Sequence, residues 1–163
     1  MDQTHLTRGV STVLVLSVLS FGLLTGAMLL IGISIVGFWK SLTPSEFVSW
    51  FASHSSRLGV IMVPLGTITL LLSLAAVVVS WRSRLKQRQW AMIAALCAVC
   101  VMVTYPVFFA EANATFVGGL SDSDVRALLD KWAVWHWGRT LLGLAGFLAA
   151  TLALQSSATE HAH

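Results

Sequence analysis

The chain has 163 residues, of which 56% are hydrophobic and 10% are charged, with a net charge of +3 and a mean hydropathy of +0.81. A soluble domain carries about 25% charged residues, so this composition excludes an ordinary soluble globule and also an intrinsically disordered chain. Since a helix needs about 20 apolar residues to cross a bilayer, the length allows four or five membrane spans at most.

Four segments without a charged side chain are long enough, or nearly so, to cross the membrane. They are Val10–Trp39, Leu58–Trp81, Trp90–Ala110 and Thr140–Leu154. The fourth reaches full length only if it begins at Trp132, which places His136 and Arg139 in its first turns. We therefore expect an all-α integral membrane four-helix bundle, a single domain over residues 1–163, with spans at about 10–39, 55–81, 90–110 and 132–154.

The connections after spans one and three each predict a helix that starts at the surface and continues into the membrane. Thr43, Pro44 and Glu46 fit an N-cap, a proline in the first helical turn and the acidic partner of a capping box. The run Ser121–Asp124 follows a Gly-Gly pair and is a second typical helix start. Short amphipathic helices are thus expected to lead into spans two and four on the non-cytoplasmic side.

A basic loop joins spans two and three and contains Arg82, Arg84, Lys86 and Arg88 without an acidic residue. Short loops rich in Lys and Arg stay in the cytoplasm, so both termini are also expected there, in a bacterial inner membrane. This charge indicates orientation and contact with lipid headgroups, and no nucleic-acid partner is expected.

Spans two and three contain residues for which we expect structural roles. Pro64 and Pro106 should kink these helices without breaking them, because neighbouring helices can satisfy the freed backbone groups. Cys97 and Cys100 lie in mid-span, where small side chains favour close helix packing.

The pattern W-x-x-x-H-x-x-R occurs twice, as Trp50, His54 and Arg57 and, at a constant offset of 82 residues, as Trp132, His136 and Arg139. Each copy enters an even-numbered span from the same side, so the bundle could consist of two parallel two-helix repeats. The halves match weakly elsewhere, which leaves both a duplication and a chance likeness open.

The motif spacing places its three side chains on one helix face. If both faces met, two imidazoles, two guanidiniums and two indoles would surround one cavity at the outer mouth. Ionisable groups at membrane depth normally face the bundle interior and mark a site. The structural alternative is that Arg57 and Arg139 reach outer headgroups while the tryptophans form an aromatic belt.

Glu111 and Asn113 lie at the outer end of span three, shortly after Tyr105. Glu111 could pair with Arg57 or Arg139, which would be a structural role. It could instead serve as a base or orient a histidine.

A short acidic helix and an Asn after span three precede the segment Trp132-Ala-Val-Trp135-His136-Trp-Gly-Arg139. This arrangement resembles the C-terminal signature of the anthrone oxygenase-like family of small four-helix membrane proteins, most of which have no known function. The resemblance carries His136, Arg139 and Asn113 over as site residues. The family pattern has a proline close to that Asn, whereas Pro106 lies seven residues upstream of Asn113.

The resemblance implies a membrane-embedded oxygenase that converts an anthrone-type polycyclic phenol to a quinone with O2 and without an organic cofactor. In our main hypothesis the ligand is a small hydrophobic aromatic compound, a histidine is the base, and arginines stabilise the anion. The ring-bearing residues expected to contact that ligand are Trp50, Trp132, Trp135 and Tyr105.

Two other functions remain open at this point. His54 and His136 on two helices could hold haem or a transition metal, as histidines do in other membrane bundles. The chain could also be a non-enzymatic membrane subunit, and its glycine-rich faces would allow a homo-oligomer.

Overall fold

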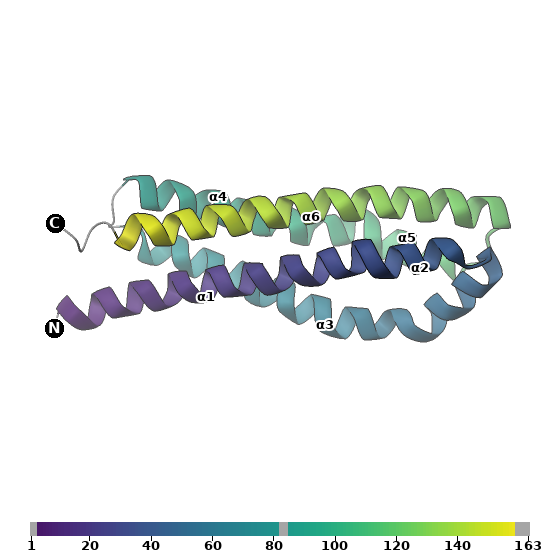
Figure 1. The fold of residues 1–163 in the computed structure, drawn as a ribbon, viewed down its shortest axis with the longest axis horizontal. Helices are drawn as coiled ribbons and strands as arrows, with labels where there is room; N and C mark the ends of the chain where they lie inside the picture. The colour runs from purple at the N-terminus through teal and green to yellow at the C-terminus, as the bar shows by residue number, and fades with distance from the viewer. Residues whose placement is uncertain (1–2, 82–84, 159–163) are drawn as a thin grey trace.

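The computed structural model describes residues 3–81 and 85–158, and the elements formed in these ranges are all helices (Figure 1). Two of the four basic residues of the predicted loop, Arg82 and Arg84, lie outside the described residues. The elements are α1 (Gln3–Leu30), η1 (Ile31–Ile35), α2 (Val36–Ser41), α3 (Pro44–Val79), α4 (Leu85–Thr104), η2 (Tyr105–Phe109), α5 (Ala110–Phe116) and α6 (Asp122–Ala158). Because η1 and η2 are π-helical turns inside longer helices, the elements join into four long rods. The first rod consists of α1, η1 and α2, the second of α3, the third of α4, η2 and α5, and the fourth of α6.

These rods form an antiparallel up-and-down bundle, in which α1 and α4 each pack against both α3 and α6. The start of α1 and the end of α6 lie together at one end, here called the terminal end. The other end, here called the distal end, carries the connections that precede α3 and α6. Figure 1 shows that α3 bows away from the other helices in its distal half.

Four segments are long and apolar enough to cross a membrane: Gly9–Ser41, Pro44–Val79, Lys86–Phe116 and Asp122–Ser157. Large apolar side chains on the outside of the bundle face the position of the lipid, among them Val60, which is 74% exposed, and Val78, which is 73% exposed. An integral membrane protein explains this exposure, because lipid is as apolar as these side chains. The predicted four-helix membrane bundle is confirmed.

Both expected helix starts are present at the distal end, and each belongs to the membrane helix itself. The Thr43 N–H donates to Glu46 Oε2 at 2.8 Å, and the Glu46 N–H donates to Thr43 Oγ1 at 3.4 Å, which forms a capping box. Asp124 N–H donates to Ser121 Oγ at 3.3 Å at the start of α6. The surface helices that the sequence suggested are therefore the first turns of α3, with 36 residues, and α6, with 37.

The two prolines inside spans two and three leave their helices unbroken, as expected. α3 continues through Pro64. At Pro106 the third rod widens into the π-helical turn η2, which accommodates the missing backbone donor. A π-helical turn holds one extra residue, so it rotates everything that follows relative to an ordinary α-helix, and such turns are frequent at functional sites.

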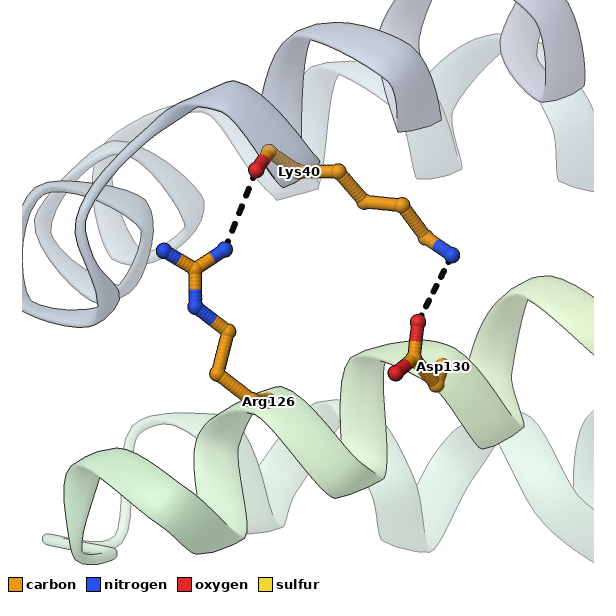
Figure 2. Close-up of polar contacts among 3 residues, drawn as sticks. All are labelled: Lys40, Arg126 and Asp130. Carbon is orange, nitrogen blue, oxygen red and sulfur yellow. Dashed lines mark hydrogen bonds and ion pairs between the residues drawn. The ribbon is translucent and has the colours of Figure 1, made fainter.

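A polar clasp at the distal end ties α2 to α6 (Figure 2). Arg126 donates to the carbonyl oxygens of Lys40, at 3.0 Å, and Leu42, at 2.5 Å, which satisfies acceptors at the end of a helix. Lys40 Nζ also pairs with Asp130 Oδ1 at 2.7 Å. These contacts hold the end of the first rod against the first three turns of α6.

The interior differs between the two ends of the bundle. At the terminal end small side chains allow close packing, and a Cβ placed on Gly146 would collide with the Phe21 ring and lie 3.0 Å from Cys97 Cβ. At the distal end the core is built from large aromatic rings. They include Trp39, Phe47, Phe51, Phe109, Phe116 and Trp132.

Candidate functional site

A cavity of about 720 Å³ lies in the distal half of the bundle. All four rods contribute to its wall, through Met28 of α1, Trp39 of α2, Met62 of α3, Phe109 of η2 and Arg139 of α6 among others. Its size is within the range of about 300–1,000 Å³ that is typical of small-molecule sites. Among the described lining residues Arg139 carries the only charge.

The cavity reaches the side of the bundle between α3 and the third rod. Val63 and Val103 line it and are 53% and 47% exposed, and Tyr105 lines it and is 49% exposed. These side chains lie in the membrane-spanning segments, so this opening faces lipid. A hydrophobic compound dissolved in the bilayer would therefore have access from the side.

His136 links Arg139 to the backbone of α1. Its Nε2 lies 2.8 Å from the carbonyl oxygen of Met28, in the last turn before the π-helical turn η1. A carbonyl oxygen only accepts, so the proton is assigned to Nε2 and Nδ1 is the acceptor. Arg139 donates to that Nδ1 from Nε at 3.2 Å and from Nη2 at 2.9 Å. Both ring nitrogens of His136 are thus engaged, and the residue is fully buried.

Close approach of α6 to the first rod depends on Gly32. A Cβ at this position would lie 3.3 Å from Cδ2 of His136 and 3.2 Å from Cζ2 of Trp137, which is tighter than most Cβ contacts in proteins. The glycine therefore lets the imidazole reach the Met28 carbonyl.

Aromatic rings pack against the hydrogen-bonded side chains of His136 and Arg139. The imidazole of His136 stacks on Trp132, with ring centroids 5.1 Å apart and an interplanar angle of 7°. The guanidinium of Arg139 lies 4.0 Å from the centroid of the Phe109 ring, a cation–π contact. Trp132 Nε1 donates to Asn113 Oδ1 at 3.0 Å. Asn113, Trp132 and Arg139 all line the cavity, so the second motif copy and Asn113 form one site.

The first motif copy repeats the local stacking but lies elsewhere. His54 stacks on Trp50 at 4.9 Å and 15°, and its Nδ1 lies 3.0 Å from the Trp50 carbonyl oxygen. Neither His54 nor Arg57 lines the cavity, and Arg57 is exposed. The cavity face of α3 instead carries Ser55 and Leu58, each one position, or about 100°, further round the helix. The two motif copies therefore do not surround one cavity.

Glu111 is also outside the site. Its side chain is exposed. The ion pair found among the described residues joins Lys40 to Asp130, and none joins Glu111 to Arg57 or Arg139. The structural pairing that the sequence suggested is thus absent.

The four aromatic residues expected to contact a ligand divide into two groups. Tyr105 and Trp132 line the cavity. Trp135 stacks on Phe108, with ring centroids 4.8 Å apart, and Trp50 packs against Trp39 at 5.6 Å. Trp50 therefore packs against a residue of the cavity wall, whereas Trp135 contacts Phe108, which does not line the cavity.

Sequence reasoning assigned no role to Trp39, which is 1% exposed and lines the cavity. Its position at the end of span one, next to Lys40, is typical of a residue at the membrane surface. The reversal of the chain at Leu42 and Thr43 folds the start of α3 over it, and this burial had no signal in the local sequence.

The described residues contain no group of three or more His, Cys, Asp or Glu side chains that could hold a metal ion. His136 uses both ring nitrogens within the protein, and His54 lies outside the cavity wall. The arrangement gives the haem or metal hypothesis no additional support.

Comparison with known proteins gives one family. A family model described as Anthrone oxygenase matches residues 47–149, which include Asn113, Trp132, His136 and Arg139. Curated proteins and solved structures give no match.

Proposed function

The chain belongs to the anthrone oxygenase family, and from this premise we propose that it is a membrane oxidoreductase that oxidises a hydrophobic aromatic compound with O2. The substrate class is an anthrone-type polycyclic phenol, and the product is the corresponding quinone. The observation that carries this proposal is an apolar, aromatic cavity whose described lining holds one cation, Arg139, and no carboxylate.

An anthrone carries a CH2 group in the ring opposite its carbonyl. Loss of a proton from that carbon, to a water molecule bound in the cavity, gives a delocalised anion with its charge concentrated on the oxygen. In a cavity of low dielectric constant, a fixed guanidinium stabilises such an oxyanion much more strongly than water does. Arg139 is proposed to supply this stabilisation.

The anion is electron-rich enough to react with O2 at the ring carbon. In the complete reaction the CH2 group becomes a carbonyl, so one oxygen atom of O2 enters the product and the other leaves as water with the two hydrogens. O2 is the oxidant, and the four electrons that reduce it come from the substrate carbon. The protein's contribution in this scheme is to bind, orient and stabilise the anion.

His136 is proposed to position Arg139. The sequence pattern suggested this residue as the base, but Nδ1 accepts hydrogen bonds from a cation and Nε2 is held by a carbonyl oxygen. A second positive charge on the ring would face Arg139 directly, which disfavours proton uptake. We therefore assign binding of the anion to Arg139 and alignment of its guanidinium to His136.

The same proposal places the cavity in the non-cytoplasmic half of a bacterial inner membrane. The basic loop and both termini would be cytoplasmic under the positive-inside rule. Reporter enzymes fused to the C-terminus test this: activity of a periplasm-dependent phosphatase in this fusion would contradict it.

Turnover tests the function directly. Purified protein in lipid nanodiscs should accelerate oxygen uptake by anthrone above the rate of spontaneous oxidation, with one anthraquinone formed for each O2 consumed. Heat-denatured protein and empty nanodiscs are the controls. A rate equal to these controls, with anthrone and with its hydroxylated derivatives, would contradict the proposal.

A further inference from the structure

Trp39 carries a polar group that the protein leaves without a partner. Its side chain is 1% exposed, and its indole Nε1 has no hydrogen-bond acceptor among the described residues. A buried N–H donor without an acceptor is unfavourable, and native proteins satisfy most such groups. An acceptor that binds in the cavity would remove this penalty.

The surroundings of Trp39 offer no acceptor of their own. Its ring contacts Phe47, Phe51 and Trp132 edge-on, with centroids 5.2–5.6 Å apart. Trp132, the other tryptophan in the cavity wall, donates its N–H to Asn113. Of these two cavity-lining indoles, one therefore has a partner within the protein and one does not.

Trp39 and Arg139 are both held against the same ring. The Trp132 centroid lies 5.2 Å from the Trp39 centroid and 5.6 Å from Cζ of Arg139. The cavity wall thus contains two side chains with N–H donors that both contact one indole, and the rest of the wall is mostly apolar. A flat compound of fused rings that places oxygen atoms on two edges could bind both.

We propose that Trp39 is a specificity-determining residue whose indole N–H donates a hydrogen bond to a second ligand oxygen, other than the one held by Arg139. The inference rests on the proposed function, since that function supplies the aromatic ligand class. The inference goes beyond the proposed function because Trp39 lies outside the range matched by the family model. The expected selectivity is for aromatic compounds with two opposed oxygen atoms over the bare hydrocarbon.

Three probe compounds of one shape separate the hydrogen bond from ring packing. Anthraquinone has two opposed carbonyl oxygens, anthrone has one, and anthracene has none. In nanodiscs under argon, the variant Trp39→Phe should bind anthraquinone about tenfold more weakly than the wild type and anthracene equally well. Trp81→Phe is the matched control, because Trp81 is 60% exposed just beyond the end of α3 and its substitution should leave all three affinities unchanged.

A second measurement needs no altered protein. In wild-type protein labelled with 15N-tryptophan, the Trp39 indole resonance, assigned with the Phe variant, should move to lower field with anthraquinone and not with anthracene. Equal binding by variant and wild type, an equal loss for all three probes, or an unmoved resonance would each overturn the inference. Turnover of anthrone by the wild type would then leave the proposed function standing, whereas a wild type that binds and oxidises none of these compounds would overturn both.

Discussion

The guanidinium of Arg139 contacts a single ring nitrogen of His136, Nδ1, through two of its own nitrogens, at 3.2 Å from Nε and 2.9 Å from Nη2. The H-x-x-R spacing makes this possible, because residues three apart are neighbours on a helix surface. Since the far side of the imidazole is fixed to Met28, the orientation of Arg139 is set from the first rod.

Substitution of His136 distinguishes a positioning residue from a base. The amide of His136→Gln can donate to the Met28 carbonyl and accept from Arg139, but it cannot take up a proton at neutral pH. We expect His136→Ala to lower kcat/KM about 100-fold and His136→Gln to stay within about tenfold of the wild type. Steady-state oxygen uptake measures both, and equal inactivity of the two variants would identify His136 as the base.

Arg139 should contribute mainly to the rate. Removal of a donor that stabilises an oxyanion lowers kcat by about 100- to 1,000-fold in other enzymes, and we expect this for Arg139→Ala. Arg139→Lys keeps the charge without the planar fork and should give an intermediate rate. Binding of anthracene, which has no oxygen, should be unchanged in both variants. An Ala variant with wild-type kcat would contradict the assignment.

The first motif copy is expected to be dispensable for turnover. His54 and Arg57 lie off the cavity wall, so the double variant His54→Ala, Arg57→Ala should retain the wild-type kcat/KM. A 100-fold loss in a variant that keeps its melting temperature would show that the two motif copies act together, as the sequence repeat suggested.

Gly32→Ala should reduce activity more than stability. The added methyl group would lie 3.2 Å from Trp137 Cζ2 and 3.3 Å from His136 Cδ2, so these rings must move by a few tenths of an ångström, and we expect the bond from His136 to Met28 to lengthen. Gly37→Ala is the matched control, because its Cβ would meet nothing within 4 Å and Ala stabilises a helix by up to about 1 kcal/mol. Equal activity of the two variants would show that this approach is not needed.

The polar clasp of Figure 2 should stabilise the distal end through Arg126 more than through Lys40. Arg126→Met leaves two carbonyl oxygens without their donor, and we expect it to lower the free energy of unfolding by about 1–2 kcal/mol. Lys40→Met removes an ion pair whose side chains are 45% and 71% exposed, which should change it by less than about 1 kcal/mol. Thermal denaturation in detergent compares them, and the reverse order would contradict this account.

Much of the fold follows from local features of the sequence. The length of the apolar runs predicts the four spans, and the Thr43 capping box predicts where α3 begins, because both depend on residues close together in the chain. Asn113, which the resemblance suggested as a site residue, accepts a hydrogen bond from Trp132, and its role stays a prediction.

What the sequence could not predict is the rotation of each helix about its axis. His54 and His136 have the same neighbours in the motif, yet one lies outside the cavity wall and the other is fully buried in the core. The π-helical turns at Ile31–Ile35 and Tyr105–Phe109 add to this rotation, and no residue pattern marked the first of them. Trp39 was missed for a similar reason, since its burial depends on contacts with α3 and α6.

The difference in packing between the two halves of the bundle has a consequence for the proton gradient across the membrane. Around Gly146 the helices touch so closely that a single added carbon would collide with Phe21, whereas the cavity opens to the side. Substrate and product therefore enter and leave through the lipid-facing opening in the distal half, and the closely packed helices around Gly146 separate the cavity from the terminal end. A protein built in this way could carry out its oxidation in an energised membrane without discharging the proton gradient across it.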